Sequence, residues 1–154
     1  MLDLPLTFLQ RPAAAGTPRP WLLVLMHGVG SNEQDLFSLS SQIPERFHVL
    51  SLRAPHRMGP GSHAWFDFSF EPGSGARSIN EEQEAHSRAV VAQTVEAASA
   101  QLGIPLEQSF IHISEPMRQR RITYALFRLN KNPPLTISKL ADPIARSVLL
   151  PHMN

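Results

Sequence analysis

Short, mainly apolar runs alternate along this chain with longer stretches in which apolar residues recur every three or four positions. Trp21 to Met26 and Phe47 to Leu52 are apolar runs bounded by turn residues, and Ser109 to Ile113 is a shorter third run. Runs of this kind are typical of strands that are buried on both faces, as in a parallel sheet. Leu4 to Leu9 additionally predicts a short edge strand.

The segment after the first apolar run predicts a helix. Asn32 suits the N-cap position, and Leu36, Leu39 and Ile43 fall on one helical face. We expect Pro44 to end this helix, because proline disfavours the helical conformation in the residue before it.

A second helix is predicted before the third run. Asn80 opens it, glutamates in its first turn suit the positive end of the helix dipole, and Gly103 closes it. Its apolar residues have helical spacing: Val91, Val95, Ala98 and Leu102. The order strand, helix, strand, helix, strand predicts an α/β fold with a doubly wound parallel sheet.

Doubly wound sheets bind ligands beyond the carboxyl ends of their strands. Two segments are expected at that edge. The first is His27-Gly-Val-Gly-Ser-Asn32, and the second is a long loop from Arg53 to Ser78 that is rich in glycine, proline, histidine and aromatic residues. Loops of this length in compact domains are often functional, so we expect the site of function here.

Composition narrows the class of protein. The chain has 154 residues, 42% hydrophobic and 18% charged, which indicates a folded globular domain. The absence of cysteine excludes disulfides, thiolate metal sites and a cysteine nucleophile. The longest apolar run is too short to span a membrane, and the first residues, which include Asp3, do not resemble a signal peptide. The expected location is therefore the cytoplasm.

Charge is unevenly distributed along the chain. Residues 1–114 contain seven arginines, no lysine and eleven acidic residues, a net charge of −4. Residues 115–154 contain five arginines, two lysines and two acidic residues, a net charge of +5. This shift predicts two parts, a main domain over 1–114 and a basic tail over 115–154 that is helical or irregular.

Three segments carry a family resemblance. They are Leu22-Leu-Val-Leu-Met-His-Gly-Val-Gly-Ser-Asn-Glu-Gln-Asp-Leu36, Leu50-Ser-Leu-Arg-Ala-Pro55 and Gly61-Ser-His-Ala-Trp-Phe-Asp67. Together they resemble the bacterial phospholipase/carboxylesterase family of α/β-hydrolases, which includes acyl-thioesterase-like enzymes, over about residues 4–111. The resemblance implies an α/β-hydrolase-type sheet and hydrolysis of a small acyl ester or thioester by Ser-His-Asp chemistry, with no metal or cofactor.

The resemblance also implies an oxyanion hole at the end of the first apolar run. Ester hydrolysis builds negative charge on the carbonyl oxygen, which fixed N–H donors must stabilise. The implied hole comprises His27, Gly28, Val29 and Gly30, with the backbone N–H of Val29 as donor. From the residues alone, His-Gly-Val-Gly is equally consistent with a simple strand-to-helix turn.

Aromatic residues in the long loop are candidates for a substrate pocket. Trp65, Phe66 and Phe68 are predicted to line an acyl pocket, and the alternative is that they anchor the loop in the core. Asp67 is expected to cap or brace the loop, because the catalytic acid of such enzymes follows the nucleophile in the chain.

The serine elbow that such a hydrolase needs is missing. No Gly-x-Ser-x-Gly sequence occurs anywhere in the 154 residues. Ser114 is the serine nearest to the expected nucleophile position, but His112 and Pro116 occupy the places of the two glycines. A Cβ and a proline ring there disfavour the sharp turn, so we expect Ser114 to be an ordinary serine at a strand end.

The catalytic aspartate and histidine that the resemblance implies are equally hard to assign. Asp142 and His152 are the candidates, but they lie ten residues apart, which is much closer than in the family. We therefore expect their pairing to be a coincidence. The arginines of the tail are expected to form a solvated basic face, and nucleic-acid binding is not expected, because no aromatic residues are interleaved with them.

His56 and His63 raise the question of a metal site in the long loop. They are seven residues apart and no pattern of acidic residues accompanies them. Such histidines are usually solvated, so no metal site is predicted.

Three functional hypotheses follow from these observations. The first is a serine hydrolase of carboxylic esters or thioesters whose catalytic residues are displaced and which is impaired or inactive as it stands. A truncation or frameshift of such a hydrolase would explain the change of character in the last forty or so residues. The second is a non-catalytic relic that binds acyl ligands, and the third is a module that binds an acidic partner through its basic tail. A truncated sheet would also expose edges, so a homo-oligomer is expected.

Overall fold

A four-stranded sheet organises residues 1–113, which are the residues described in the computed structural model. The strands lie in the order β1-β3-β2-β8. Both pairs that include β2 are parallel, and β1 runs antiparallel to β3 at the edge. The strand bounds are β1 Phe8–Arg11, β2 Trp21–Met26, β3 Phe47–Leu52 and β8 Ser109–Ile113. The three apolar runs thus form the three predicted parallel strands.

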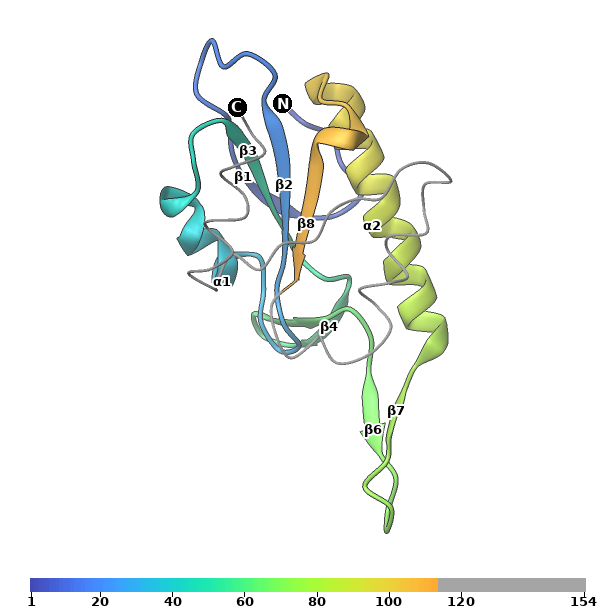
Figure 1. Ribbon diagram of the computed structural model, residues 1–154. Helices are drawn as coiled ribbons and strands as arrows, with labels where there is room; N and C mark the ends of the chain where they lie inside the picture. Colours follow the sequence, from blue (N-terminus) through green and yellow to red (C-terminus); the bar gives the residue numbers. More distant parts are fainter. Residues whose placement is uncertain (114–154) are drawn as a thin grey trace.

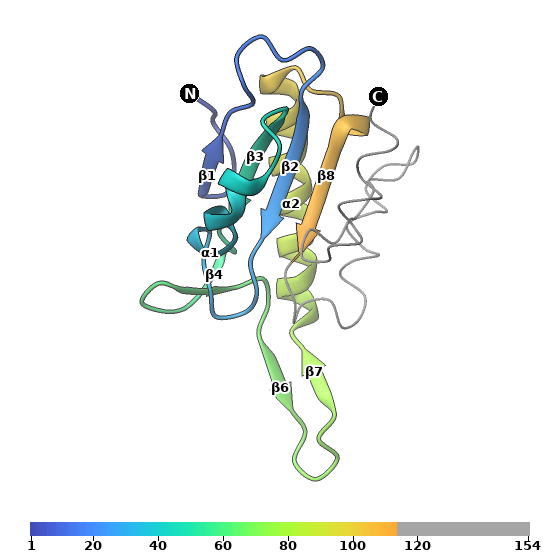
Figure 2. The same ribbon diagram turned by 60° about the vertical axis from the view of Figure 1, so that its left-hand side comes forward.

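Helical segments cover both faces of this sheet. Helix α1, Gln34–Phe37, and the 3-10 helix Ser38–Gln42 lie on one face, and α2, Glu81–Leu102, lies on the other (Figures 1 and 2). Each face buries its own apolar cluster, because successive strand residues point to opposite sides. The doubly wound α/β class predicted from the sequence is therefore confirmed.

The first helix is shorter than predicted. Only Gln34–Phe37 is α-helical, and the chain tightens into 3-10 geometry over the following five residues. A serine-rich sequence explains the difference, because serine hydroxyls compete for backbone carbonyls: the Ser38 hydroxyl donates to Asp35 O at 2.8 Å. Leu39, predicted on the buried face, is 40% exposed. The N-cap residue is Glu33 and not Asn32 as predicted, although the Asn32 Oδ1 still accepts the Gln34 N–H at 2.9 Å.

The edge strand lies later in the chain than predicted. The prediction was Leu4 to Leu9, whereas β1 begins at Phe8. Leu4 and Leu6 instead pack against the core on the α2 side, and the intervening Pro5 has no N–H to give to a ladder.

Helix α2 begins and ends where the sequence predicts. The Asn80 side chain accepts the Gln83 N–H at 3.0 Å, which satisfies one of the free donors of the first turn. Gly103 terminates the helix with φ of 65°, a left-handed conformation that glycine adopts without strain. Buried side chains of α2, including Val91, Val95 and Ala98, face the sheet.

The predicted long loop, residues 53–78, contains two small hairpins. Strands β4, His56–Gly59, and β5, Ser62–Ala64, form the first, and strands β6, Phe68–Phe70, and β7, Arg77–Ile79, form the second. Glycine and proline between each pair of strands supply the turns, which is why a loop prediction missed the short strands. The β6–β7 hairpin projects beyond the carboxyl ends of β2 and β8 (Figure 1).

Two further predictions concern a membrane span and the basic tail. None of the helices in residues 1–113 is both long and apolar enough to cross a membrane. The predicted basic tail over 115–154 lies outside the described residues, as do Ser114, Asp142 and His152.

Candidate functional site

Residues 27–33 form a loop at the carboxyl end of β2. Because β2 is the central strand of a parallel trio, its last residue, Met26, pairs with Leu52 of β3 on one side and with Ile113 of β8 on the other. The loop therefore leaves the sheet between the carboxyl ends of its two neighbours. This is the edge at which ligands bind in doubly wound folds.

The His27 ring connects this loop to the end of β3. His27 is fully buried, and its Nε2 accepts the backbone N–H of Ala54 at 3.0 Å. Its Nδ1 lies 2.7 Å from Gly28 O and must carry the proton, since the other nitrogen is an acceptor. Burial lowers the pKa of His27 below its ordinary value, which favours this neutral form. Both ring nitrogens are occupied, so His27 braces the loop and is not placed to act as a base.

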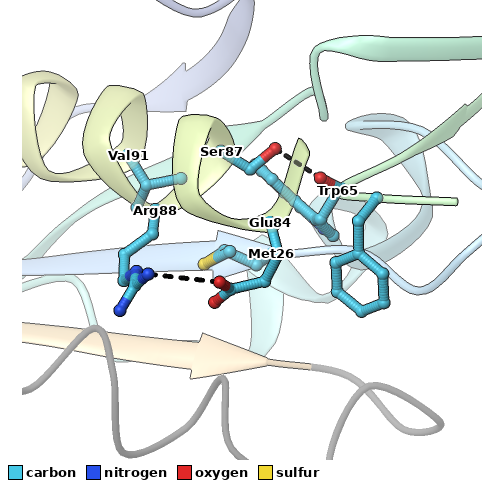
Figure 3. A pocket seen from close by; sticks show the side chains of 7 residues that line it. Met26, Trp65, Glu84, Ser87, Arg88 and Val91 are labelled. Atoms are coloured by element: carbon cyan, nitrogen blue, oxygen red, sulfur yellow. Dashed lines mark hydrogen bonds and ion pairs between the residues drawn. The ribbon is translucent and has the colours of Figure 1, made fainter. Parts of the chain in front are cut away.

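Trp65 fixes the same loop from the α2 side. Its indole Nε1 donates to His27 O at 2.9 Å, and the two rings lie 5.5 Å apart. The Ser87 hydroxyl of α2 donates in turn to Trp65 O (Figure 3). Trp65 and Phe66 are buried members of the core, which supports the alternative that they are loop anchors.

A shallow hollow lies beside these anchors. Its lining includes Met26, Trp65 and Phe66 together with the Glu84–Arg88 ion pair of α2 (Figure 3). The hollow has room for about one water molecule, so it does not hold an acyl chain in this conformation. Trp65 and Phe66 as pocket residues remain a prediction.

The β4–β5 hairpin holds the middle of the loop. Gly30 N–H donates to His63 O, and His63 N–H donates to Ser31 O, both at 2.9 Å. The Asn32 side-chain amide donates to Gly61 O at 2.8 Å. Gly30 has φ of 84°, a region that side chains disfavour, so glycine is needed for the loop to meet the hairpin.

An ion pair fixes the end of the loop. The Glu33 carboxylate is buried and receives two hydrogen bonds from Arg53, which directly follows β3. These bonds lower the pKa of Glu33 and raise that of Arg53. Sequence reasoning missed both residues, because a pair twenty positions apart is visible only once β2 and β3 are placed side by side. The available signal in the sequence was that Glu33 and Arg53 each lie within a segment that carries the family resemblance.

The backbone N–H of Val29 is a donor that the contacts of residues 27–33 leave unused. Val29 is half-buried, and its N–H forms no hydrogen bond with any of residues 1–113. The adjacent carbonyl, Gly28 O, is already occupied by His27 Nδ1 and by the Ser31 N–H at 3.3 Å. The arrangement can therefore donate one fixed hydrogen bond to an anion that reaches the carboxyl end of β2.

Phe68 lies apart from the other predicted pocket residues. It belongs to β6, where Phe70 contacts its ring edge-on at 5.8 Å and the Arg77 guanidinium lies 4.1 Å above it. It does not line the hollow beside Trp65. Asp67 braces the start of this hairpin through a 3.0 Å hydrogen bond from the Gln83 side chain.

The loop histidines are not brought together into one cluster. His56 lies near His86 of α2, with ring centroids 6.0 Å apart, whereas the backbone of His63 pairs with the loop after β2. In the part of the chain that the structure describes, no three histidine, aspartate or glutamate residues are grouped so as to hold a metal ion.

Comparison with known proteins identifies the fold through structure alone. No protein-family model and no curated protein sequence matches the chain. Among solved structures, a carboxylesterase from Mesorhizobium loti matches with a TM-score of 0.64 at 19% identity, covering 86% of this chain and 58% of that one. The Bacillus cereus carboxylesterase matches with a TM-score of 0.55 at 20% identity, covering 70% and 47%.

A third match, esterase PE8, has a TM-score of 0.54 at 22% identity and covers 70% of this chain and 51% of that one. The chain thus spans about half the length of the structures it matches. At these identities the likeness establishes the fold: the described residues have the α/β architecture of α/β-hydrolase structures, with a mixed, mostly parallel sheet.

Proposed function

We propose that residues 27–33 are the oxyanion-binding loop of a carboxylic ester or thioester hydrolase, and that this chain has kept the loop without the serine elbow. The Val29 N–H, which makes no hydrogen bond to any of residues 1–113, carries the proposal. It is the donor that the family resemblance implies, and it lies on a loop fixed at both ends and in its middle.

The chemistry of ester hydrolysis explains why such a loop is needed. Attack on the carbonyl carbon moves charge onto the oxygen, and a donor already in position stabilises that charge without reorganisation. One donor of this kind contributes about 3–4 kcal/mol to the barrier in a complete serine hydrolase. The hydrogen bonds from Trp65, Ala54 and the β4–β5 hairpin support the required rigidity.

The second half of such a site comes from the turn after the neighbouring strand. In α/β-hydrolases that turn carries the nucleophile and the second N–H donor. Strand β8 occupies the corresponding place, because Ile113 pairs with Met26 directly before the loop. The sequence that follows is Ser114-Glu-Pro116, without the glycines of the elbow. We therefore propose an intact oxyanion loop beside an incomplete catalytic half.

Two measurements on the purified full chain test the catalytic side of this proposal. A fluorophosphonate forms a covalent adduct with an activated serine, and intact-mass spectrometry detects it. We expect no adduct and no hydrolysis of p-nitrophenyl butyrate above the rate in buffer. One adduct per chain, accompanied by turnover, would show that the nucleophile is present at another position and that the site is complete.

A further inference from the structure

The charged pair Glu33–Arg53 joins the end of the oxyanion loop to the end of β3. We infer that this pair positions the Val29 N–H, an inference that rests on the proposed function of that donor. Glu33 is 3% exposed, although it lies in a loop and carries a charge. Burying a carboxylate is costly, so its place in the loop calls for a reason.

The two hydrogen bonds of the pair fix the orientation of the Glu33 carboxylate as well as its distance from Arg53. Arg53 Nε lies 2.7 Å from one carboxylate oxygen of Glu33, and Nη2 lies 2.5 Å from the other. Two parallel hydrogen bonds between planar groups prevent rotation of one against the other. The Ser51 hydroxyl also donates to the backbone carbonyl of Glu33 at 2.7 Å. The backbone and the side chain of Glu33 are thus both held by the end of β3.

The other end of the loop is fixed on the same short stretch of chain. Ala54, the residue after Arg53, donates its N–H to His27 Nε2 at 3.0 Å. Residues 27 and 33 are therefore both anchored on residues 51–54. Val29 lies between these anchors, so the direction of its N–H depends on both of them.

Stability alone does not account for the pair. Glu33 is buried, but the Arg53 side chain is 39% exposed, and an ion pair with one partner in contact with water contributes little to stability. We therefore ascribe to the pair the role of fixing one conformation of the loop. The chain offers a contrast in Arg88–Glu84, which makes a single contact at 3.2 Å within one helix.

The experiment follows the Val29 amide by NMR in the full chain during titration with butylphosphonate, a tetrahedral anion that resembles the hydrolytic intermediate. Arg53→Met removes both hydrogen bonds, and Glu33→Gln keeps the shape and one acceptor. Arg11→Met is the matched control, because Arg11 also makes two hydrogen bonds but at the amino end of β3, away from the loop. We expect a saturable shift in the wild type and in Arg11→Met, its loss in Arg53→Met, and an intermediate response in Glu33→Gln.

The outcomes separate the two proposals. A saturable Val29 shift in the wild type that persists unchanged in Arg53→Met overturns the positioning role and leaves the oxyanion loop standing. No shift in the wild type overturns the oxyanion loop, and the inference with it. Should Arg53→Met fail to fold, as judged by the amide resonances of α2, Glu33→Gln decides: a wild-type response contradicts the inference and a reduced one supports it.

Discussion

His27 shows how one side chain can set the shape of a loop. Its imidazole accepts from Ala54, 27 residues away, and donates to the carbonyl of its own neighbour, Gly28. Only the neutral ring with its proton on Nδ1 can do both. Protonation of Nε2 would place two donors against each other and break the bond to Ala54.

This arrangement predicts that acid destabilises the protein. Burial lowers the pKa of His27, and also of His48, below the ordinary value of 6.5, so the unfolded chain takes up protons first as pH falls. The histidine contribution to stability is therefore complete above pH 6.5 and is lost as pH drops from there toward the lower folded pKa. We expect urea unfolding to show this decline between about pH 7 and about pH 5.

Single substitutions show which histidine causes the decline in stability as the pH falls. His86→Asn is the control for the substitution itself, because His86 is exposed. His27→Asn should reduce the slope, and His48→Asn should reduce it separately. Equal slopes in all four proteins would contradict the lowered pKa values of His27 and His48.

Trp65 provides a second test at the residue scale. Trp65→Phe keeps an aromatic ring but removes the donor to the buried His27 carbonyl. Leaving that carbonyl unpaired should cost about 1–3 kcal/mol of unfolding free energy. Trp21→Phe is the matched control, because Trp21 is half-buried and stacks on Phe110 at 5.1 Å. A loss for Trp65→Phe no larger than that for Trp21→Phe would argue against a role for the indole N–H.

At the residue scale, the sequence located the loop but not the contacts that hold it. His-Gly-Val-Gly could be recognised because glycines follow an apolar run. The Glu33–Arg53 pair and the Ala54–His27 bond join the segments that follow β2 and β3, which become neighbours only in the sheet. Such contacts depend on which strands lie side by side, and the apolar runs alone do not specify the order of the strands.

At the scale of elements, continuous apolar runs were the most reliable signal. The predicted bounds of β2, β3 and β8 match because each strand is largely buried and bounded by turn residues. Helix α1 was predicted too long, since apolar spacing does not reveal that serines will draw the chain into 3-10 geometry. The hairpins of residues 56–79 were missed because strands of three or four residues leave almost no periodicity.

The glycine that ends α2 leads to a prediction about the stability of this helix. Gly103→Ala places a Cβ on a left-handed residue and should cost about 1–2 kcal/mol of unfolding free energy. Gly59→Ala is the control, because Gly59 has no positive φ and its added Cβ would meet open space. Chemical denaturation of both variants provides the comparison. Equal costs would mean that the left-handed C-cap does not limit the stability of α2.

At the scale of the whole molecule, residues 1–113 form a sheet covered on both faces that matches about half of each carboxylesterase structure. The described part contains residues 27–33, the proposed oxyanion loop, at the carboxyl end of β2, and strand β8 beside it. The fold class and the position of this edge were predictable from the order of strands and helices. Whether chemistry occurs there depends on the residues after Ile113, where the sequence lacks the elbow.

The most direct test of this account is the response of two neighbouring amides to butylphosphonate in the uniformly ¹⁵N-labelled chain. The Val29 N–H is unpaired among the described residues, whereas the Gly30 N–H is already bonded to His63 O at 2.9 Å. The account predicts a saturable downfield shift of the Val29 proton, little change at Gly30, and no response to butanol, which lacks the charge. A Val29 resonance that stays fixed, or that moves no more than Gly30, would contradict the oxyanion loop.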